Sequence, residues 1–153
     1  YEIGNEPGFL TPYLYHYAGR PDRSAERVRA LLEEFRVGRR GLPGQDDSGA
    51  MSAWYLFGAM GFFPVAGQDV YLIGSPVFEE STLMLEGGKR FTVKAPGVSR
   101  TNRYVCGATL NGKDWNRCWF THSDLLQGGE LVLEMGPVST GWGRELPPPS
   151  LSD

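Results

Sequence analysis

The stretch 48–60, SGAMSAWYLFGAM, decides the fold class of this chain because it predicts a helix that is apolar on nearly every side. Gly61 and Pro64 follow it and give the signature of a helix end. A helix that is hydrophobic all round is buried on most of its sides. We therefore expect it to belong to a body larger than two neighbouring helices can supply, with the missing helices upstream.

Two more helices are expected before this stretch. The aromatic segment 9–18 is followed by Gly19 and Pro21, a common helix stop signature. Ser24 is expected to cap the next helix. The apolar residues of that helix are spaced i, i+3, i+4 and i+7 and form one stripe: Val28, Leu31, Leu32 and Phe35.

Residues 69–137 are expected to form short strands, because β-branched and aromatic residues there often alternate with polar ones. The segment Glu86-Gly87-Gly88-Lys89 predicts a hairpin turn, and Asn111-Gly112 predicts a type I′ turn. The expected strands are 70–73, 81–85, 90–94, 104–110 and 130–134.

The pattern as a whole predicts an α+β fragment in three parts. A helical part, 1–68, contains the glycine-rich loop 41–49, and a small antiparallel β-module follows at 69–143. The tail 144–153 is rich in proline and is expected to be extended or disordered. The chain opens without a methionine, and we expect it to be a piece of a longer protein.

Composition excludes several classes of protein. The 153 residues include 15 Lys and Arg against 18 Asp and Glu, and no basic cluster could follow a phosphate backbone. No stretch approaches about 18 consecutive apolar residues, so no transmembrane helix is expected. Cys106 and Cys118 are too few for a disulfide scaffold or a zinc cluster, which leaves either one disulfide or two buried thiols.

Gly4-Asn5-Glu6-Pro7 is the first candidate for a functional site. The proline restricts Glu6 to extended backbone and thereby fixes where its carboxylate points. The simpler interpretation is an acid at a helix N-terminus, which the helix dipole favours without any function.

The loop 41–49, GLPGQDDSG, is the second candidate. Asp46 and Asp47 repel each other, so something is expected to offset their charge, such as a metal, sugar hydroxyls or a water to be activated. The alternative is that Asp47 or Ser48 caps the helix that follows. Capping explains one residue but neither the pair nor the glycines, which let a ligand approach the backbone.

The two histidines, His16 and His122, are expected to be structural. The sequence contains no His or Cys spacing typical of a zinc site and no Gly-x-Ser-x-Gly motif. Its glycine-rich segments also lack the lysine of a phosphate loop. Serine hydrolases and nucleotide-dependent enzymes are therefore disfavoured.

Several blocks, in order, resemble the late part of the catalytic domain of glycoside hydrolase family 92, the calcium-dependent exo-acting α-mannosidases. The similarity extends over most of the chain up to about residue 143. The blocks include Asn5-Glu6-Pro7, the segment 46–55, Gly61-Phe62-Phe63-Pro64-Val65, Thr121-His122-Ser123-Asp124 and Met135-Gly136-Pro137.

This resemblance implies that 1–68 forms the last helices of an alpha/alpha six-fold barrel, with the β-module trailing it. It implies an inverting hydrolase that removes terminal α-linked mannose from glycans, many members being α-1,2-mannosidases, with bound Ca²⁺. It also implies that the rest of the same enzyme is a partner of this chain. Members are often exported, which favours a secreted or periplasmic location.

Residue by residue, the resemblance makes Asp47 the catalytic base. It makes Asp46 the acidic residue next to that base, which is distinct from the general acid of the family. Asn5 and Glu6 match the segment that contacts sugar and calcium, so the implied calcium ligands are Asn5, Glu6 and Asp47. Gln45 and Leu10 depart from the family pattern and put metal contacts in doubt.

The general acid of the family lies in an upstream Glu-Gly-Asn segment that nothing here matches. The isolated chain is therefore expected to be inactive.

Two alternatives remain open. One is a non-catalytic carbohydrate-binding module, with Trp115 and Trp119 as stacking platforms. The other is a different barrel glycosidase, which would share the architecture but not the block 46–55.

Overall fold

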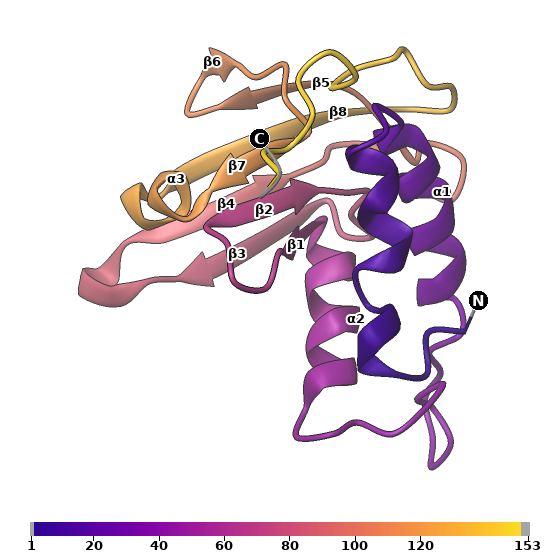
Figure 1. The fold of residues 1–153 in the computed structure, drawn as a ribbon. Helices are drawn as coiled ribbons and strands as arrows, with labels where there is room; N and C mark the ends of the chain where they lie inside the picture. Colours follow the sequence, from indigo (N-terminus) through magenta and orange to yellow (C-terminus); the bar gives the residue numbers. More distant parts are fainter. Residues whose placement is uncertain (1, 151–153) are drawn as a thin grey trace.

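Two sheets and a layer of helices make up residues 2–150, the part of the chain that this computed structural model describes. Figure 1 shows α1 and α2 standing below and beside the sheets, so the α+β class is confirmed. The helices are α1 (Pro21–Leu32), α2 (Ala50–Met60) and α3 (His122–Gln127), with short 3-10 helices η1 (Glu6–Gly8), η2 (Thr11–His16) and η3 (Glu86–Gly88).

The smaller sheet has the order β1-β2-β7, and the larger has the order β3-β4-β8-β5-β6. The strands of the smaller sheet are β1 (Phe62–Pro64), β2 (Val70–Ile73) and β7 (Trp119–Thr121). Those of the larger are β3 (Glu80–Met84), β4 (Arg90–Lys94), β5 (Tyr104–Leu110), β6 (Lys113–Asp114) and β8 (Gly129–Gly136). All five expected strands exist, with small shifts at the ends of two.

One pair corrects the expected antiparallel module: β4 and β8 are parallel, with Phe91 opposite Gly129 and Val93 opposite Leu131. Parallel strands need a long crossover connection. Here β5, β6, β7 and α3 supply it. The hairpin between β3 and β4 and the Asn111-Gly112 turn between β5 and β6 both form, and the φ values of Asn111 and Gly112 are 51° and 74°.

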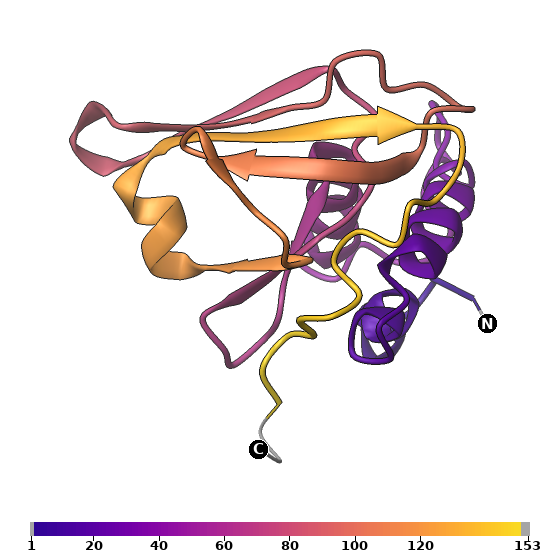
Figure 2. The same cartoon turned by 90° about the horizontal axis from the view of Figure 1, so that it is seen from above.

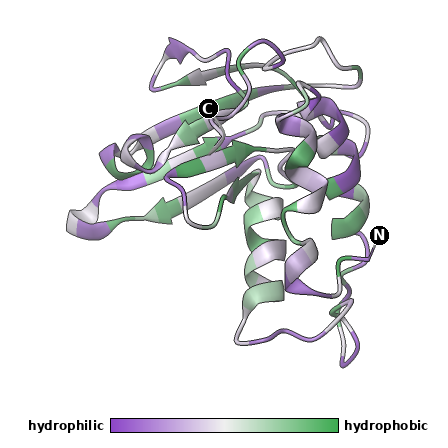
Figure 3. Cartoon of the chain, in the orientation of Figure 1, coloured by the Kyte–Doolittle hydropathy of each residue, from purple (hydrophilic) through white to green (hydrophobic). Residues whose placement is uncertain are grey.

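Buried side chains form two clusters, one beneath the larger sheet and one between the helices and the smaller sheet. Phe91, Leu131 and Leu133 are fully buried in the first, while Tyr13 and Trp54 are among the most buried residues of the second. Figure 3 shows the hydrophobic residues on strands and α2, with hydrophilic residues on loops and hairpin tips. The helices are therefore fastened to the sheets by apolar packing.

The segment expected to be one helix over 9–18 instead holds only the short η2, and η1 precedes it across a turn. Pro7 and Pro12 lie near the start of each and cannot donate an intrahelical hydrogen bond. The cap expected at Ser24 is also wrong. Helix α1 begins at Pro21, three residues earlier than a cap at Ser24 requires, and a proline suits the first helical position because its missing N–H would have no partner within the helix.

Ser24 instead lies inside α1 and binds His16. The neutral His16 ring donates from Nε2 to the Ile73 carbonyl at 2.7 Å, and its Nδ1 lies 2.9 Å from Ser24 Oγ. The ring is fully buried and so joins η2, α1 and β2. The structural interpretation of this histidine is confirmed.

Burial lowers the pKa of His16 below its ordinary value near 6.5, so folding favours the neutral ring. The unfolded chain takes up this proton at a higher pH than the folded chain does. Stability is therefore expected to be highest above pH ~6.5 and to fall below it by up to about 1.4 kcal/mol per pH unit. Thermal unfolding from pH 8 to pH 5 measures this, and the His16→Gln variant should have a flatter profile than His122→Gln.

The segment after β8 lies back against the molecule rather than apart from it (Figure 2). Trp119 Nε1 donates to the Leu146 carbonyl, and Arg144 pairs with Asp22 of α1 at 3.4 Å. Part of the proline-rich tail is thus held in place, while residues 151–153 lie outside the described residues.

Both cysteines are free thiols, which settles the open alternative against a disulfide. Cys118 is fully buried, and burial raises the pKa of its thiol to about 12. Cys106 is only partly buried.

Candidate functional site

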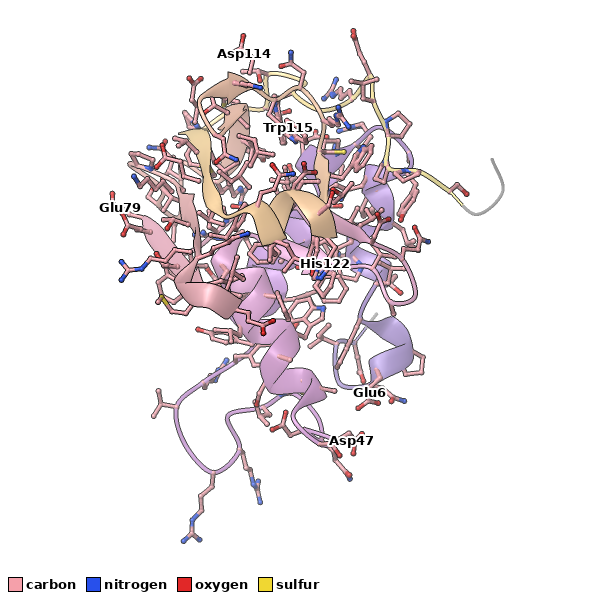
Figure 4. The ribbon with its side chains drawn as sticks, turned by 90° about the vertical axis from the view of Figure 1, so that its left-hand side faces the viewer. Glu6, Asp47, Glu79, Asp114, Trp115 and His122 are labelled. Atoms are coloured by element: carbon pink, nitrogen blue, oxygen red, sulfur yellow. The ribbon has the colours of Figure 1, made fainter. Side chains whose placement is uncertain are left out.

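The two candidate loops meet at one end of the molecule, next to the N-terminus of α2. Figure 4 shows Glu6 and Asp47 at that end. The backbones of Gly4 and Gly44 are in direct contact, since a Cβ atom on Gly44 would lie only 2.2 Å from the Gly4 carbonyl oxygen. The structure therefore brings together the two segments that the sequence analysis selected separately.

Asp46 caps α2. Its Oδ1 accepts a hydrogen bond from the Ser52 backbone N–H at 2.8 Å, and its Oδ2 accepts one from Ser52 Oγ at 2.9 Å. A carboxylate here satisfies one free N–H of the first turn and lies favourably in the helix dipole. The expectation that Asp47 or Ser48 makes this cap is wrong, and the helix begins at Ala50 rather than at residue 48.

Asp47 stands in a strained backbone turn. Asp47, Ser48 and Gly49 all have positive φ, at 38°, 60° and 90°. Such conformations are uncommon outside glycine and concentrate at functional sites. The Asp47 side chain is exposed and makes no side-chain hydrogen bond or ion pair to other residues in 2–150. Capping thus explains Asp46 and leaves the Asp47 carboxylate available.

Glu6 is the first residue of η1, so the extended backbone expected for it is wrong: the Gly8 N–H donates to the Asn5 carbonyl and closes a 3-10 turn over Glu6. The extended residue is Asn5, at φ −149° and ψ 140°, which is exposed and makes no side-chain cap. Oε1 of Glu6 is buried and has no hydrogen-bond partner within the described part of the chain. A buried carboxylate oxygen without a partner is costly, so this atom fits a cation or a donor supplied by a ligand. The helix-dipole interpretation does not account for it.

A complete metal centre is not formed by the described residues alone. Among residues 2–150, no three His, Cys, Asp or Glu side chains gather closely enough to hold an ion. Asn5, Glu6 and Asp47 are oxygen donors of the kind that calcium takes, and calcium needs six to eight oxygen ligands. The donor chemistry fits, and the rest of the ligand set would come from water, substrate or other parts of the enzyme.

The departures at Gln45 and Leu10 have different surroundings. Gln45 is exposed on the loop. Leu10 packs against the helical core cluster, so it contributes apolar contact where a polar residue would be expected in the family.

Trp54, by contrast, belongs to the core. It is buried, donates from Nε1 to the Phe9 carbonyl at 3.0 Å and stacks on Phe35 with ring centroids 5.9 Å apart. Tyr55 is 36% exposed, so residues 2–150 cover α2 only in part.

Trp115 and Trp119 do not form an open stacking platform. The Arg117 guanidinium lies over both rings, 4.6 Å and 5.1 Å from their centroids. Their indole N–H groups donate to the backbone carbonyls of Trp119 and Leu146. These contacts favour a packing role and remove the main support for a carbohydrate-binding module.

His122 lies at the start of α3, where its Nδ1 is 2.8 Å from Tyr71 Oη. Thr121 and Asp124 form a capping box around this helix start. The block 121–124 therefore has a structural explanation, away from the loops of the candidate site.

Next to the candidate site lies an open hollow of about 490 Å³ that sequence reasoning missed. Its lining combines four charged residues with four uncharged ones: Glu2, Glu34, Arg36 and Arg40, and Ile3, Gly4, Leu42 and Pro43. The only feature of the sequence that bears on this hollow is the run of charged residues between 33 and 40, and such a run by itself predicts only a solvated surface.

Comparison with known proteins identifies the family. Residues 1–137 match the model of the glycosyl hydrolase family 92 catalytic domain. A protein of Arthroderma benhamiae, described as an uncharacterized secreted glycosidase, is 44% identical over 153 residues, covering 95% of this chain and 20% of that protein.

Two solved structures from Bacteroides thetaiotaomicron are also similar. The family GH92 alpha-mannosidase BT3965 has a TM-score of 0.91 and 35% identity, covering 97% of this chain and 21% of that one. The family GH92 inverting mannosidase BT2199 has a TM-score of 0.92 and 40% identity, covering 100% of this chain and 21% of that one.

The chain spans about a fifth of the length of each of these relatives. The family match nevertheless takes in both candidate loops, the helices between them and the strands up to Pro137. This chain therefore belongs to glycosyl hydrolase family 92.

Proposed function

We propose that this chain is the C-terminal part of the catalytic domain of an inverting α-mannosidase that releases terminal α-linked mannose, with a preference for α-1,2 linkages. The observation that carries the proposal is the contact of Gly4 with Gly44, which brings Glu6 and Asp47 to one end of the molecule. The chain shares 35% and 40% identity with two GH92 mannosidases, one of them named as inverting.

In this proposal Asp47 is the general base. Inversion requires a carboxylate that activates a water on one face of the sugar and an acid on the other, about 6.5–9.5 Å away. The exposed carboxylate of Asp47 is free of hydrogen bonds within residues 2–150 and can accept a proton from such a water. Asp46 positions it, since the Ser52 bonds hold the preceding residue rigidly at the helix start.

Asn5, Glu6 and Asp47 are proposed to contact calcium, and Asn5 and Glu6 also the mannose. The buried, unpartnered Oε1 of Glu6 supports this assignment. When bound, a calcium ion supplies positive charge that binds and orients sugar hydroxyls.

We further propose that 1–68 completes an alpha/alpha six-fold barrel whose other helices lie upstream, with 69–143 as a β-module and 144–153 as a tail. Exposed apolar side chains on the helical side support this, since Leu14 and Leu56 are 49% and 53% exposed. The upstream part would cover them and would supply the general acid. The name of the Arthroderma relative favours an exported enzyme, and residues 2–150 contain no helix able to cross a membrane.

Mannose release by the full-length enzyme tests the proposal. With α-1,2-linked mannobiose and calcium, the enzyme is expected to release mannose with inverted configuration, followed by NMR of the anomeric proton. A chelator should lower the rate at least about ten-fold, and added calcium should restore it. The isolated chain of 153 residues should release none, because it lacks the acid.

Two results would contradict parts of this assignment. Retained configuration of the product would exclude Asp47 as a base acting on water. Full activity in the chelator would remove calcium from the mechanism.

A further inference from the structure

The segment 138–146 follows β8 and connects the larger sheet to α1 (Figure 2). Within the described chain this segment has no helix or strand and pairs with neither sheet. It also lies beyond residues 1–137, which the family model matches. We call it the clasp, because it contacts strand β5, the segment before β7 and helix α1 in turn.

Side chains hold the first part of the clasp on the β-module. The Thr140 hydroxyl donates to the Cys106 carbonyl of β5 at 3.1 Å. The Trp142 indole N–H donates to the Trp115 carbonyl at 2.8 Å, and its ring packs against the core cluster of the larger sheet. Each of these contacts can break without disturbing a strand pair, so the clasp can leave while the sheets stay paired.

A second, replaceable ion pair holds the far part of the clasp on α1. Arg144 Nη2 lies 3.4 Å from Asp22 Oδ2. The same carboxylate accepts two hydrogen bonds from Arg20, both at 2.9 Å. When Arg144 leaves, Asp22 therefore keeps a charged partner, and the usual cost of an unpaired buried charge does not arise.

A small cavity lies under the clasp. Its volume is about 10 Å³, and its lining includes Ser139 and Trp142 of the clasp and Asp22 of α1. That volume is near the smallest that holds one water, about 10–15 Å³. Water at this place can take over polar contacts as the clasp lifts, which lowers the free energy of opening.

Gly143 seats the clasp on Cys118. Both residues are buried, and Cys118 is fully buried. A Cβ on Gly143 would lie 2.8 Å from the Cys118 Cβ and 3.2 Å from its backbone nitrogen. The φ of Gly143 is also positive, at 73°, so both the space and the backbone favour glycine. The reactivity of the Cys118 thiol should therefore report whether the clasp is closed.

We propose that the clasp opens and closes as a unit while both sheets stay folded, and that opening frees Arg144 from α1 and uncovers Cys118. The seating of Gly143 and the pair of Arg144 with Asp22 set the fraction that is closed. This inference goes beyond the proposed function and uses none of its residues, so its test does not depend on mannose release.

The test follows the reaction of Cys118 with N-ethylmaleimide in the folded full-length enzyme, by mass spectrometry of the peptide that carries this thiol. Gly143→Ala places a Cβ against Cys118 and is expected to raise the rate about ten-fold or more, because overpacking disfavours the closed clasp. The matched control is Gly97→Ala. Gly97 has nearly the same φ, 72°, but no described atom lies within 4 Å of the added Cβ, so its rate should stay within about two-fold of wild type.

A second pair of variants tests the ion pair. Arg144→Met is expected to raise the rate of Cys118 labelling about two- to five-fold, the effect of losing one weak ion pair. Arg20→Met removes the other partner of the same carboxylate and leaves the clasp contact in place. It is expected to keep the rate within about two-fold of wild type.

Thermal unfolding of the same preparations separates local opening from unfolding of the whole protein. Faster labelling confined to Gly143→Ala and Arg144→Met, with little change in unfolding temperature, supports the clasp. Equal labelling rates in Gly143→Ala and Gly97→Ala, or rates that follow the loss of unfolding temperature in all four variants, overturn it. If Gly143→Ala does not fold, the comparison of Arg144→Met with Arg20→Met decides alone, and equal rates there overturn the proposal.

Discussion

Replacing Asp47 by Asn in the full-length enzyme is expected to lower kcat for mannose release by about 10³-fold or more, because the amide cannot take a proton from water. The fold should be unaffected, since the Asp47 side chain is exposed and makes no side-chain hydrogen bond within residues 2–150. Asparagine also tolerates the positive φ of 38° found at this position. Steady-state kinetics and thermal unfolding of the same preparation measure both effects.

Asp46→Asn is the control that separates a base from a helix cap. An amide at this position can still accept a hydrogen bond from the Ser52 N–H, but it loses the negative charge at the start of α2. We expect a loss of about 1 kcal/mol or less in unfolding free energy and a smaller fall in kcat than for Asp47→Asn. If Asp46→Asn were the more damaging of the two, the roles assigned to the neighbouring carboxylates would have to be exchanged.

The sequence predicted the strands well because their signal is local. The segments 70–73, 90–94 and 104–110 have the predicted bounds, and Phe91 and Val93 face the core as their alternation implies. Strands β1, β6 and β7 were missed because two or three residues are too short to establish a period.

The pairing of the strands could not be predicted in the same way, since no local pattern indicates that β4 lies parallel to β8. Those two strands are brought together by the packing of everything between them. Helix α3 was not predicted, although Thr121 and Asp124 have the spacing of a capping box and gave a readable signal for a helix start.

The candidate site, like the fold, could be predicted from the sequence only in part. The sequence located Glu6, Asp46 and Asp47, because Pro7, paired carboxylates and glycines are visible in a string of letters. The sequence could not tell which of Asp46 and Asp47 caps α2. Which of the two carboxylates reaches Ser52 depends on the backbone angles of the three residues that precede the helix. The roles proposed for these residues remain predictions that kinetics must decide.

Gly44→Ala is expected to damage the candidate site directly, because the site depends on a contact between the backbones of two loops. The φ of Gly44 is not positive, so alanine suits its backbone and the effect is purely steric. The new Cβ would lie 2.2 Å from the Gly4 carbonyl oxygen and 2.7 Å from the Gly4 Cα. Backbone atoms cannot rotate away as a side chain can, so the two loops must separate.

A separation of about 1 Å between the loops would move Glu6 relative to Asp47, and a displacement of that size can cost about 10²-fold in kcat. Overpacking of this kind also typically costs about 1–3 kcal/mol of stability. The effect should follow the depth of overlap. It is expected to be smaller for Gly4→Ala, whose Cβ would lie 3.1 Å from the Pro43 carbonyl, and absent for Gly74→Ala, whose nearest contact is 3.7 Å.

Kinetics and unfolding of the three glycine variants in the full-length enzyme measure this series. Loss of activity in Gly44→Ala with a small stability change would mean that the contact serves chiefly to position the two carboxylates. Wild-type activity in Gly44→Ala would mean that the Glu6 and Asp47 segments act independently, and the single site proposed for them would not survive.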